Sequence, residues 1–315
     1  MKNRLVFIGS YTEPIILGTG EPVAGSGDGV TVYRMDDAGH LTRLFAAGKP
    51  NPTYLALSPD KRFLYTVNEL KEYHEEASAA VSAYAIHPDS GELTFLNRRM
   101  TGGGDACCVS GSARTAGFLF EANLPAAALR HIPDFAGRQP RHRRVLYAAR
   151  QRRGPRGRQA RAVLHQVSPD RGKHVLVADL GTDEIRVYGI DWSCGLGYSN
   201  AARQQSLLSR ATDPAGFVFD RGGRMLYLVT EIGNSVRVYL MTASEPHGFS
   251  PVVAYVAKRM RGETISACIK LHPSGAFLYA SNRGYDSIAS FRVHQDGSLT
   301  PLSIMEDGRQ NAAGL

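Results

Sequence analysis

The sequence repeats one short pattern at a nearly regular interval, and this repeat constrains the fold more than any other feature. Five copies read RFLYTVNEL at 62–70, GFLFEANL at 117–124, KHVLVADL at 173–180, RMLYLVTEI at 224–232 and AFLYASNRG at 276–284, and RLVFIGSYT at 4–12 is a weaker sixth copy. Each copy is an apolar, β-branched or aromatic run that closes on Asn, Asp, Ser or Thr. This pattern predicts a buried strand followed by a turn.

Further short strands flank most of these copies. The segment before a copy ends in a tight turn, as in TYLALSPDKR at 53–62 and GFVFDRGGR at 216–224, where Pro presets φ and Gly accepts a positive φ. The segment after a copy alternates, as in SVRVYLM at 235–241, and three of these lead through a turn to another strand, as in SGELTFL at 90–96. One repeat therefore predicts about four short antiparallel strands.

The interval between the repeats indicates the architecture. As a marker we take the residue that follows the closing polar position, which is Tyr11, Glu69, Leu124, Leu180, Glu231 and Arg283 in the six copies. The successive intervals are 58, 55, 56, 51 and 52 residues, a period near 54. Four strands at this period are typical of a β-propeller blade, and they fit an all-β solenoid or sandwich less well. The predicted fold class is therefore all-β, with propeller architecture.

The two ends of the chain bear on how such a ring closes. A propeller removes exposed sheet edges by closing into a ring, but the first copy has no strand before it. The chain stops at EDGRQNAAGL, 306–315, where another such strand is expected. We therefore expect a single propeller domain over residues 1–315 that lacks most of its last blade, with a truncated end at 309–315.

Positive charge is concentrated in one segment. The formal net charge is +8, but residues 130–161 hold eleven Arg and one Asp, so the rest of the chain carries about −2. Three interpretations are open: an arm that binds nucleic acid or phosphate, a basic disordered insert, or a stretch whose reading frame is disrupted. We favour the last, because strand periodicity is lost in the same region.

The sequence argues against several classes of site and location. No apolar run approaches the roughly 20 residues of a transmembrane helix, and the N-terminus has the pattern of a first strand rather than a signal peptide. The four cysteines show no CxxC spacing, so neither a zinc site nor a disulfide framework is expected. We therefore expect a cytoplasmic protein with no metal and no membrane contact.

The marker residues suggest where a functional site lies. They occupy one position in every blade, so they are expected to converge on one rim of the central channel. Glu69, Glu231 and Arg283 are charged, and charged groups are costly to desolvate there unless they are paired or used. One interpretation is a Glu–Arg ion pair that holds blades together. The other is an acidic or phosphorylated substrate bound by Arg283, with a carboxylate nearby for proton transfer.

Whole phrases of the later repeats resemble a known family. VLVADLGTDEIRVY at 175–188, FDRGGRMLYLVTEIGNSVRVY at 219–239 and LHPSGAFLYASNRGYDSIASFRV at 271–293 are similar to the lactonase family of seven-bladed propellers, which includes propeller-type 6-phosphogluconolactonases and fungal carboxy-muconate lactonising enzymes. The resemblance covers roughly 1–105 and 163–308, and at 106–163 it nearly vanishes apart from FLFEAN. We expect a scrambled third blade there, from a frame disruption at about 108–163, and a second disruption near 309.

The resemblance implies specific site residues. A Glu in the family's Asn-Glu-Leu-like phrase matches Glu231, an Arg in its Ser-Asn-Arg phrase matches Arg283, and the second His of its His-x-His phrase matches His165. The first His falls on Val163. The family's Pro-Arg-His phrase falls on 214–216, which reads Pro-Ala-Gly, so that expected Arg and His are absent.

The reaction implied by the resemblance is hydrolysis of a sugar lactone such as 6-phosphogluconolactone, without a cofactor or metal. Water attacks the ring ester carbonyl, Glu231 or His165 takes its proton, and Arg283 binds the substrate anion or the developing oxyanion. Glu69 is a further rim carboxylate that binds substrate. Because the Arg expected at position 215 is missing, we expect low or no lactonase activity.

Two other functions stay open on the sequence alone. A propeller that has lost catalytic side chains serves well as a binding scaffold for a partner, and a lone His on a strand is a common structural residue. Nucleic-acid binding through 130–161 is the less favoured alternative. The sequence leaves the oligomeric state open.

Overall fold

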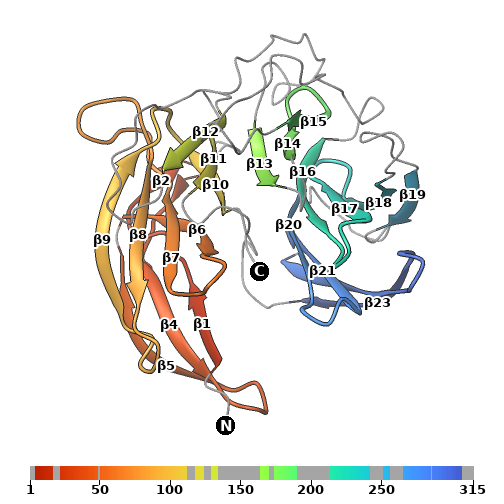
Figure 1. Ribbon diagram of the computed structural model, residues 1–315, viewed down its shortest axis with the longest axis horizontal. Coiled ribbons are helices and arrows are strands. Elements are labelled where there is room, and N and C mark those ends of the chain that lie inside the picture. The colour runs from red at the N-terminus through yellow and green to blue at the C-terminus, as the bar shows by residue number, and fades with distance from the viewer. Residues whose placement is uncertain are drawn as a thin grey trace. The chain divides into compact units, whose positions relative to one another are not determined.

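The structure is a computed structural model of the 315-residue chain, and its described part is built from β-strands and turns (Figure 1). It describes residues 4–16, 22–48, 50–111, 118–123, 129–133, 164–169, 174–189, 213–241, 251–255, 265–284 and 286–306. These residues contain no helix. The chain divides into two compact units, residues 1–149 and 150–315, and each is a set of antiparallel sheets.

The first unit contains three sheets of three or four strands and one small hairpin. Their strand orders are β1-β4-β5, β6-β7-β8-β9, β10-β11-β12 and β2-β3. The strands are β1 (Arg4–Ile8), β2 (Ile15–Ile16), β3 (Pro22–Val23), β4 (Val30–Met35), β5 (Leu41–Ala47), β6 (Pro52–Leu57), β7 (Phe63–Asn68), β8 (Ala80–Ile86), β9 (Leu93–Met100), β10 (Ala106–Gly111), β11 (Phe118–Asn123) and β12 (Leu129–Pro133). Neighbouring strands follow one another along the chain, as expected for a meander, apart from the hairpin β2-β3 between β1 and β4.

The second unit contains three more sheets of the same design. Their strand orders are β13-β14-β15, β16-β17-β18-β19 and β20-β21-β22-β23. The strands are β13 (Leu164–Pro169), β14 (His174–Asp179), β15 (Glu184–Gly189), β16 (Pro214–Phe219), β17 (Met225–Thr230), β18 (Ser235–Leu240), β19 (Pro251–Tyr255), β20 (Ile265–Leu271), β21 (Phe277–Arg283), β22 (Ser287–Val293) and β23 (Leu299–Glu306).

The second strand of each sheet explains how neighbouring sheets pack. In β17, Tyr227 and Val229 belong to the apolar cluster shared with the β20–β23 sheet, whereas Leu226 and Leu228 belong to the cluster shared with the β13–β15 sheet. All four side chains are buried. Successive residues of a strand point to opposite faces, so a continuously apolar run such as MLYLVT fills the space on both sides of its sheet.

The observed strands confirm the predicted repeat. The five strong copies of the pattern form β7, β11, β14, β17 and β21, each the second strand of its sheet, and the weaker copy at the N-terminus forms β1. The segments expected before the copies form β6, β13, β16 and β20, and the alternating segments after them form β4, β8, β15, β18 and β22. The four-strand unit is complete in three of the described sheets.

Several expectations concern residues that the structure describes only in part. Within 106–163 it describes three strands, β10 to β12, whereas residues 134–163, and with them most of the Arg-rich segment, lie outside the described residues, as does the end at 309–315. The frame disruption, the single domain and the truncated end stay predictions. Among the described residues, no helix has the length and apolar character needed to cross a membrane.

Candidate active site

A β-bulge recurs near the start of the first strand in four of the sheets. In β6, β10, β13 and β16 the pairing with the next strand shifts by one residue, and the extra residues are Thr53, Cys107, His165 and Ala215. A bulge bends its strand and re-aims a side chain, and bulges are common beside active sites. The repeated backbone therefore presents one re-aimed side chain per sheet, and in β13 that side chain is the predicted His165.

His165 contacts Glu231 of the neighbouring sheet. Its Nε2 lies 3.3 Å from Oε2 of Glu231, which directly follows β17. The Glu231 side chain is 1% exposed and the His165 side chain is 21% exposed. A buried carboxylate is costly unless it is paired, and the imidazole supplies a partner that still reaches solvent. The structure thus brings two of the predicted catalytic residues together.

The main chain of Glu231 is held from two sides. Its N–H donates to the carbonyl of Asp213 at 2.9 Å, and its carbonyl accepts a hydrogen bond from the N–H of Ser266 in β20 at 3.1 Å. The Asp213 carboxylate also accepts a hydrogen bond of 2.6 Å from the N–H of Gly233, in the turn that follows Glu231. Because Asp213 is itself buried, these contacts fix the position from which Glu231 meets His165.

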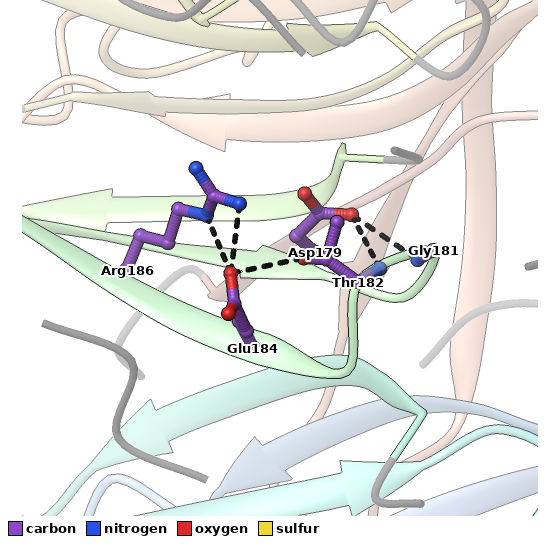
Figure 2. A network of polar contacts seen from close by, with 5 residues as sticks. All are labelled: Asp179, Gly181, Thr182, Glu184 and Arg186. Atoms are coloured by element: carbon purple, nitrogen blue, oxygen red, sulfur yellow. Dashed lines mark hydrogen bonds and ion pairs between the residues drawn. The ribbon is translucent and has the colours of Figure 1, made fainter. Parts of the chain in front are cut away.

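The turn between β14 and β15 is stabilised by a polar network (Figure 2). Oδ1 of Asp179 accepts hydrogen bonds from the N–H groups of Gly181 and Thr182, at 3.1 and 3.2 Å. Arg186, whose side chain is 6% exposed, donates to Oε2 of Glu184 from Nε at 2.9 Å and lies 2.7 Å from it through Nη2. The Thr182 hydroxyl contacts the same oxygen at 3.3 Å. A buried Arg needs such a partner, and the hydrogen bonds of Asp179 and the Thr182–Glu184 contact hold the turn in place.

The β14–β15 turn also supports Asp213. Asp183, in the middle of the turn, has a φ of 59°, and its Oδ1 accepts a hydrogen bond from the N–H of Asp213 at 2.9 Å. A chain of contacts therefore runs from the β14–β15 turn through Asp213 to Glu231. Asp213 and Asp183 were not predicted as positioning residues, because their spacing in the sequence gives no sign that they meet.

Arg283 ends β21, close to the strand that holds Glu231. It pairs with Ile265 at the start of β20, while the adjacent Ser266 pairs with Asn282 and donates to the Glu231 carbonyl. Arg283 is half-buried. Within the part of the chain that the structure describes, its guanidinium has no ion-pair partner, so the carboxylate of Glu231 is paired with His165 and not with Arg283.

Glu69, in the first unit, is held in the same way as Glu231. Its N–H donates to the carbonyl of Asn51 at 3.0 Å, and Asn51 precedes Pro52 of β6 as Asp213 precedes Pro214 of β16. Asn51 and Asp213 share a positive φ, 37° and 34°. The pseudo-symmetry that defined the marker positions therefore extends to the residues that support them. The convergence of Glu69 with the markers of the second unit stays a prediction.

Tyr11 is a site residue that the sequence reasoning missed. It is not one of the charged markers, but its hydroxyl donates a hydrogen bond of 2.9 Å to Oε2 of Glu69. The available signal was its equivalence to Glu69 in the neighbouring repeat. At the other markers, Leu180 is buried and Leu124 lies outside the described residues. Among the described residues, no cluster of His, Cys, Asp or Glu has the arrangement of a metal site.

Position 215 holds Ala where the family phrase is expected to hold an Arg. Ala215, at the place of the family's Arg, is 0% exposed and belongs to the apolar cluster between the β16–β19 and β20–β23 sheets. The neighbouring Gly216 likewise offers no polar side chain. Val163, matched to the first His of the family phrase, lies outside the described residues.

The recurring antiparallel sheets agree with a comparison to protein families. Residues 5–311 match the family model described as lactonase, 7-bladed beta-propeller. The chain belongs to this lactonase family. Its architecture is therefore that of a seven-bladed β-propeller, and the predicted fold class is confirmed.

Individual members and solved structures are similar to this lactonase-family chain over most of its length. It is 27% identical over 304 residues to a 6-phosphogluconolactonase of Bacillus subtilis, a match that covers 94% of this chain and 79% of the relative. A putative 6-phosphogluconolactonase structure from Bacteroides fragilis is 26% identical, with a TM-score of 0.76 over 96% of this chain and 82% of that one. A periplasmic gluconolactonase structure from Pseudomonas aeruginosa has a TM-score of 0.81 at 24% identity, over 98% and 84% of the two chains, and supports the fold.

Proposed function

We propose that this chain is a lactone hydrolase that opens a sugar lactone such as 6-phosphogluconolactone, with reduced activity. Its curated relative of 27% identity carries the name 6-phosphogluconolactonase. The observation that carries the proposal is the contact of 3.3 Å between Nε2 of His165 and Oε2 of Glu231. A base whose ring is oriented by a buried carboxylate is the group that ester hydrolysis by water requires.

The exposures of the two side chains assign their roles. Glu231 is 1% exposed, so water reaches the imidazole of His165, at 21%, in preference to the carboxylate. Because Nε2 is the ring nitrogen that faces Oε2 of Glu231, at 3.3 Å, Nδ1 is the nitrogen that accepts the proton of the attacking water in this proposal. The new C–O bond forms at the ring ester carbonyl, the ring C–O bond breaks, and the imidazolium returns its proton to the leaving ring oxygen. Glu231 stabilises the imidazolium in between.

Arg283 binds the negative charge of the substrate in this proposal. A guanidinium suits a phosphate or carboxylate group because it donates several hydrogen bonds in a fixed plane. The second cation of the family pattern is replaced by Ala215. Removal of one electrostatic donor costs roughly 10²–10³ in rate in other enzymes, which is the size of the loss we expect.

Kinetics with 6-phosphogluconolactone and unphosphorylated gluconolactone test the proposal. Above the spontaneous rate in buffer, we expect slow turnover that His165→Gln and Glu231→Gln each abolish. Arg283→Ala should raise KM more for the phosphorylated lactone than for the neutral one. Turnover that survives in the His165→Gln and Glu231→Gln double variant would overturn the proposed base. A kcat of about 10–10³ s⁻¹, in the range of ordinary enzymes, would overturn the reduced activity.

A non-catalytic binding scaffold is the second candidate, and the buried Ala215 is the observation that favours it. In that case the lactone would open only at its spontaneous rate, and none of the His165, Glu231 and Arg283 variants would alter that rate. Nucleic-acid binding through 130–161 and a cytoplasmic location stay predictions. The first requires an affinity that falls steeply with salt and disappears on deletion of the segment.

A further inference from the structure

A side-chain amide joins the strand that carries His165 to the neighbouring sheet. Nε2 of Gln166 donates to the carbonyl of Phe217 in β16 at 2.7 Å, and Oε1 of Gln166 accepts from the N–H of Phe217, also at 2.7 Å. The amide thus pairs with the N–H and the carbonyl of Phe217 in the way that the backbone of a neighbouring strand would. Phe217 is 2% exposed, so its peptide groups need these partners.

Gly216 leaves room for this contact. A Cβ atom at position 216 would lie 2.7 Å from Oε1 of Gln166, closer than side chains tolerate without a shift. A Cβ at this position would therefore shift the Gln166 amide from its present place against the backbone of Phe217. Gly216 of β16 thus leaves space for a side chain of β13.

The contact is specific to the sheet that carries the candidate base. Gln166 is the first paired residue after the bulge at His165. The equivalent residues after the other one-residue bulges are Tyr54, Cys108 and Gly216, none of which carries an amide. A bulge leaves its extra residue, here His165, outside the hydrogen-bond ladder. Because both ends of the Gln166 amide are hydrogen-bonded to Phe217, Gln166 limits the movement of the adjacent His165.

We propose that Gln166 is a positioning residue, which through its paired hydrogen bonds to Phe217 holds the His165 imidazole against Glu231. This inference rests on the proposed function, because it assigns a purpose to the His165–Glu231 contact. The amide fixes β13 relative to β16, and Glu231 is fixed to the same sheet through Asp213, immediately before β16. The strand of His165 and the main chain of Glu231 are thus both held by hydrogen bonds to β16 or to the residue just before it.

NMR of protein labelled with ¹⁵N-histidine tests the inference, because it observes the His165 N–H directly. In the wild type we expect a downfield imidazole N–H signal that exchanges slowly with water and is absent from Glu231→Gln. Gln166→Met, which keeps the length of the side chain, should quicken exchange roughly tenfold or more, the factor expected when two hydrogen bonds are lost. Gly216→Ala leaves Gln166 in place but displaces its amide, and should have the same effect.

Tyr227→Phe is the matched control, because it also removes a buried hydrogen bond between neighbouring sheet elements. The Tyr227 hydroxyl donates to the carbonyl of Gly297 at 3.2 Å, away from β13. It should lower the melting temperature and leave the His165 signal unchanged. If Gln166→Met and Gly216→Ala keep the wild-type signal and exchange rate, Gln166 does not position His165, although the dyad stands. If Glu231→Gln leaves the signal unchanged, the dyad itself is wrong and the inference falls with it.

Discussion

The His165–Glu231 contact predicts an energetic coupling that a double-mutant cycle measures. At 3.3 Å, two full charges in an effective dielectric of about 20 attract each other by about 5 kcal/mol. Desolvation of the Glu231 carboxylate, which is 1% exposed, offsets a large part of that attraction. We therefore expect a coupling free energy of about 1–3 kcal/mol between His165→Gln and Glu231→Gln, within the range found for polar neighbours.

Urea unfolding of the four proteins, followed by circular dichroism at about pH 5.5 and about pH 9, measures this coupling on both sides of the ordinary His pKa of about 6.5. The coupling should be larger at the lower pH, because only the protonated imidazole is charged. The exposed His40–Asp36 pair, at 3.0 Å, is the matched control and should show a coupling within experimental error. A coupling below about 0.5 kcal/mol at both pH values would refute the buried pair.

Three further predictions follow from particular contacts. Asp213→Ala should lower the free energy of unfolding by about 2 kcal/mol in urea titrations, because the N–H of Gly233 loses its acceptor at 2.6 Å. A loss within experimental error would show that the turn after Glu231 does not depend on the Asp213 carboxylate. Burial, together with nearby carboxylates, raises the pKa of Tyr227 to about 12. The folded state favours the neutral hydroxyl, so this stabilisation is complete below about pH 10 and is lost as the pH rises to about 12. Over that interval the free energy of unfolding should fall by up to about 3 kcal/mol more in the wild type than in Tyr227→Phe, and parallel pH profiles would contradict this. Ala215→Arg should lower the free energy of unfolding by about 3–5 kcal/mol, because a guanidinium would enter the apolar cluster around the fully buried Ala215; an unchanged urea midpoint would show that position 215 reaches solvent.

The strands were predictable because their pattern is local. A run such as MLYLVT is apolar at every position, and a central strand packed on both faces needs no polar side. The closing Thr230 and its counterpart Asn282 mark strand ends because their side chains bind the residue that follows the turn. The Thr230 hydroxyl accepts the N–H of Ser235 at 3.0 Å, and the Asn282 amide donates to the Ser287 hydroxyl at 3.4 Å in the equivalent place. These two contacts each join residues five positions apart, within the reach of sequence patterns.

The candidate site was predictable only in its parts. His165, Glu231 and Arg283 were each identified, but the partner of Glu231 was not, and an ion pair with Arg283 was one of the interpretations. The pairing depends on the bulge in β13, a shift of one residue that nothing in LHQVSP reveals. The hydrogen bond between Tyr11 and Glu69 escaped prediction for a related reason, since it joins two repeats whose marker residues differ in chemistry.

The hydrogen bonds that position the candidate site involve main-chain atoms, whereas the proposed chemistry belongs to side chains. Asp213 supports Glu231 through main-chain atoms, as Asn51 supports Glu69, and Ser266 binds the Glu231 carbonyl irrespective of the side chain at 231. Ala215 occupies in β16 the bulge position that His165 occupies in β13. A change of side chain at a bulge therefore alters the chemistry of one sheet pair without disturbing the ladders that define the fold. Within the proposed function, Ala at 215 would therefore lower the rate of lactone opening while the His165–Glu231 contact persists.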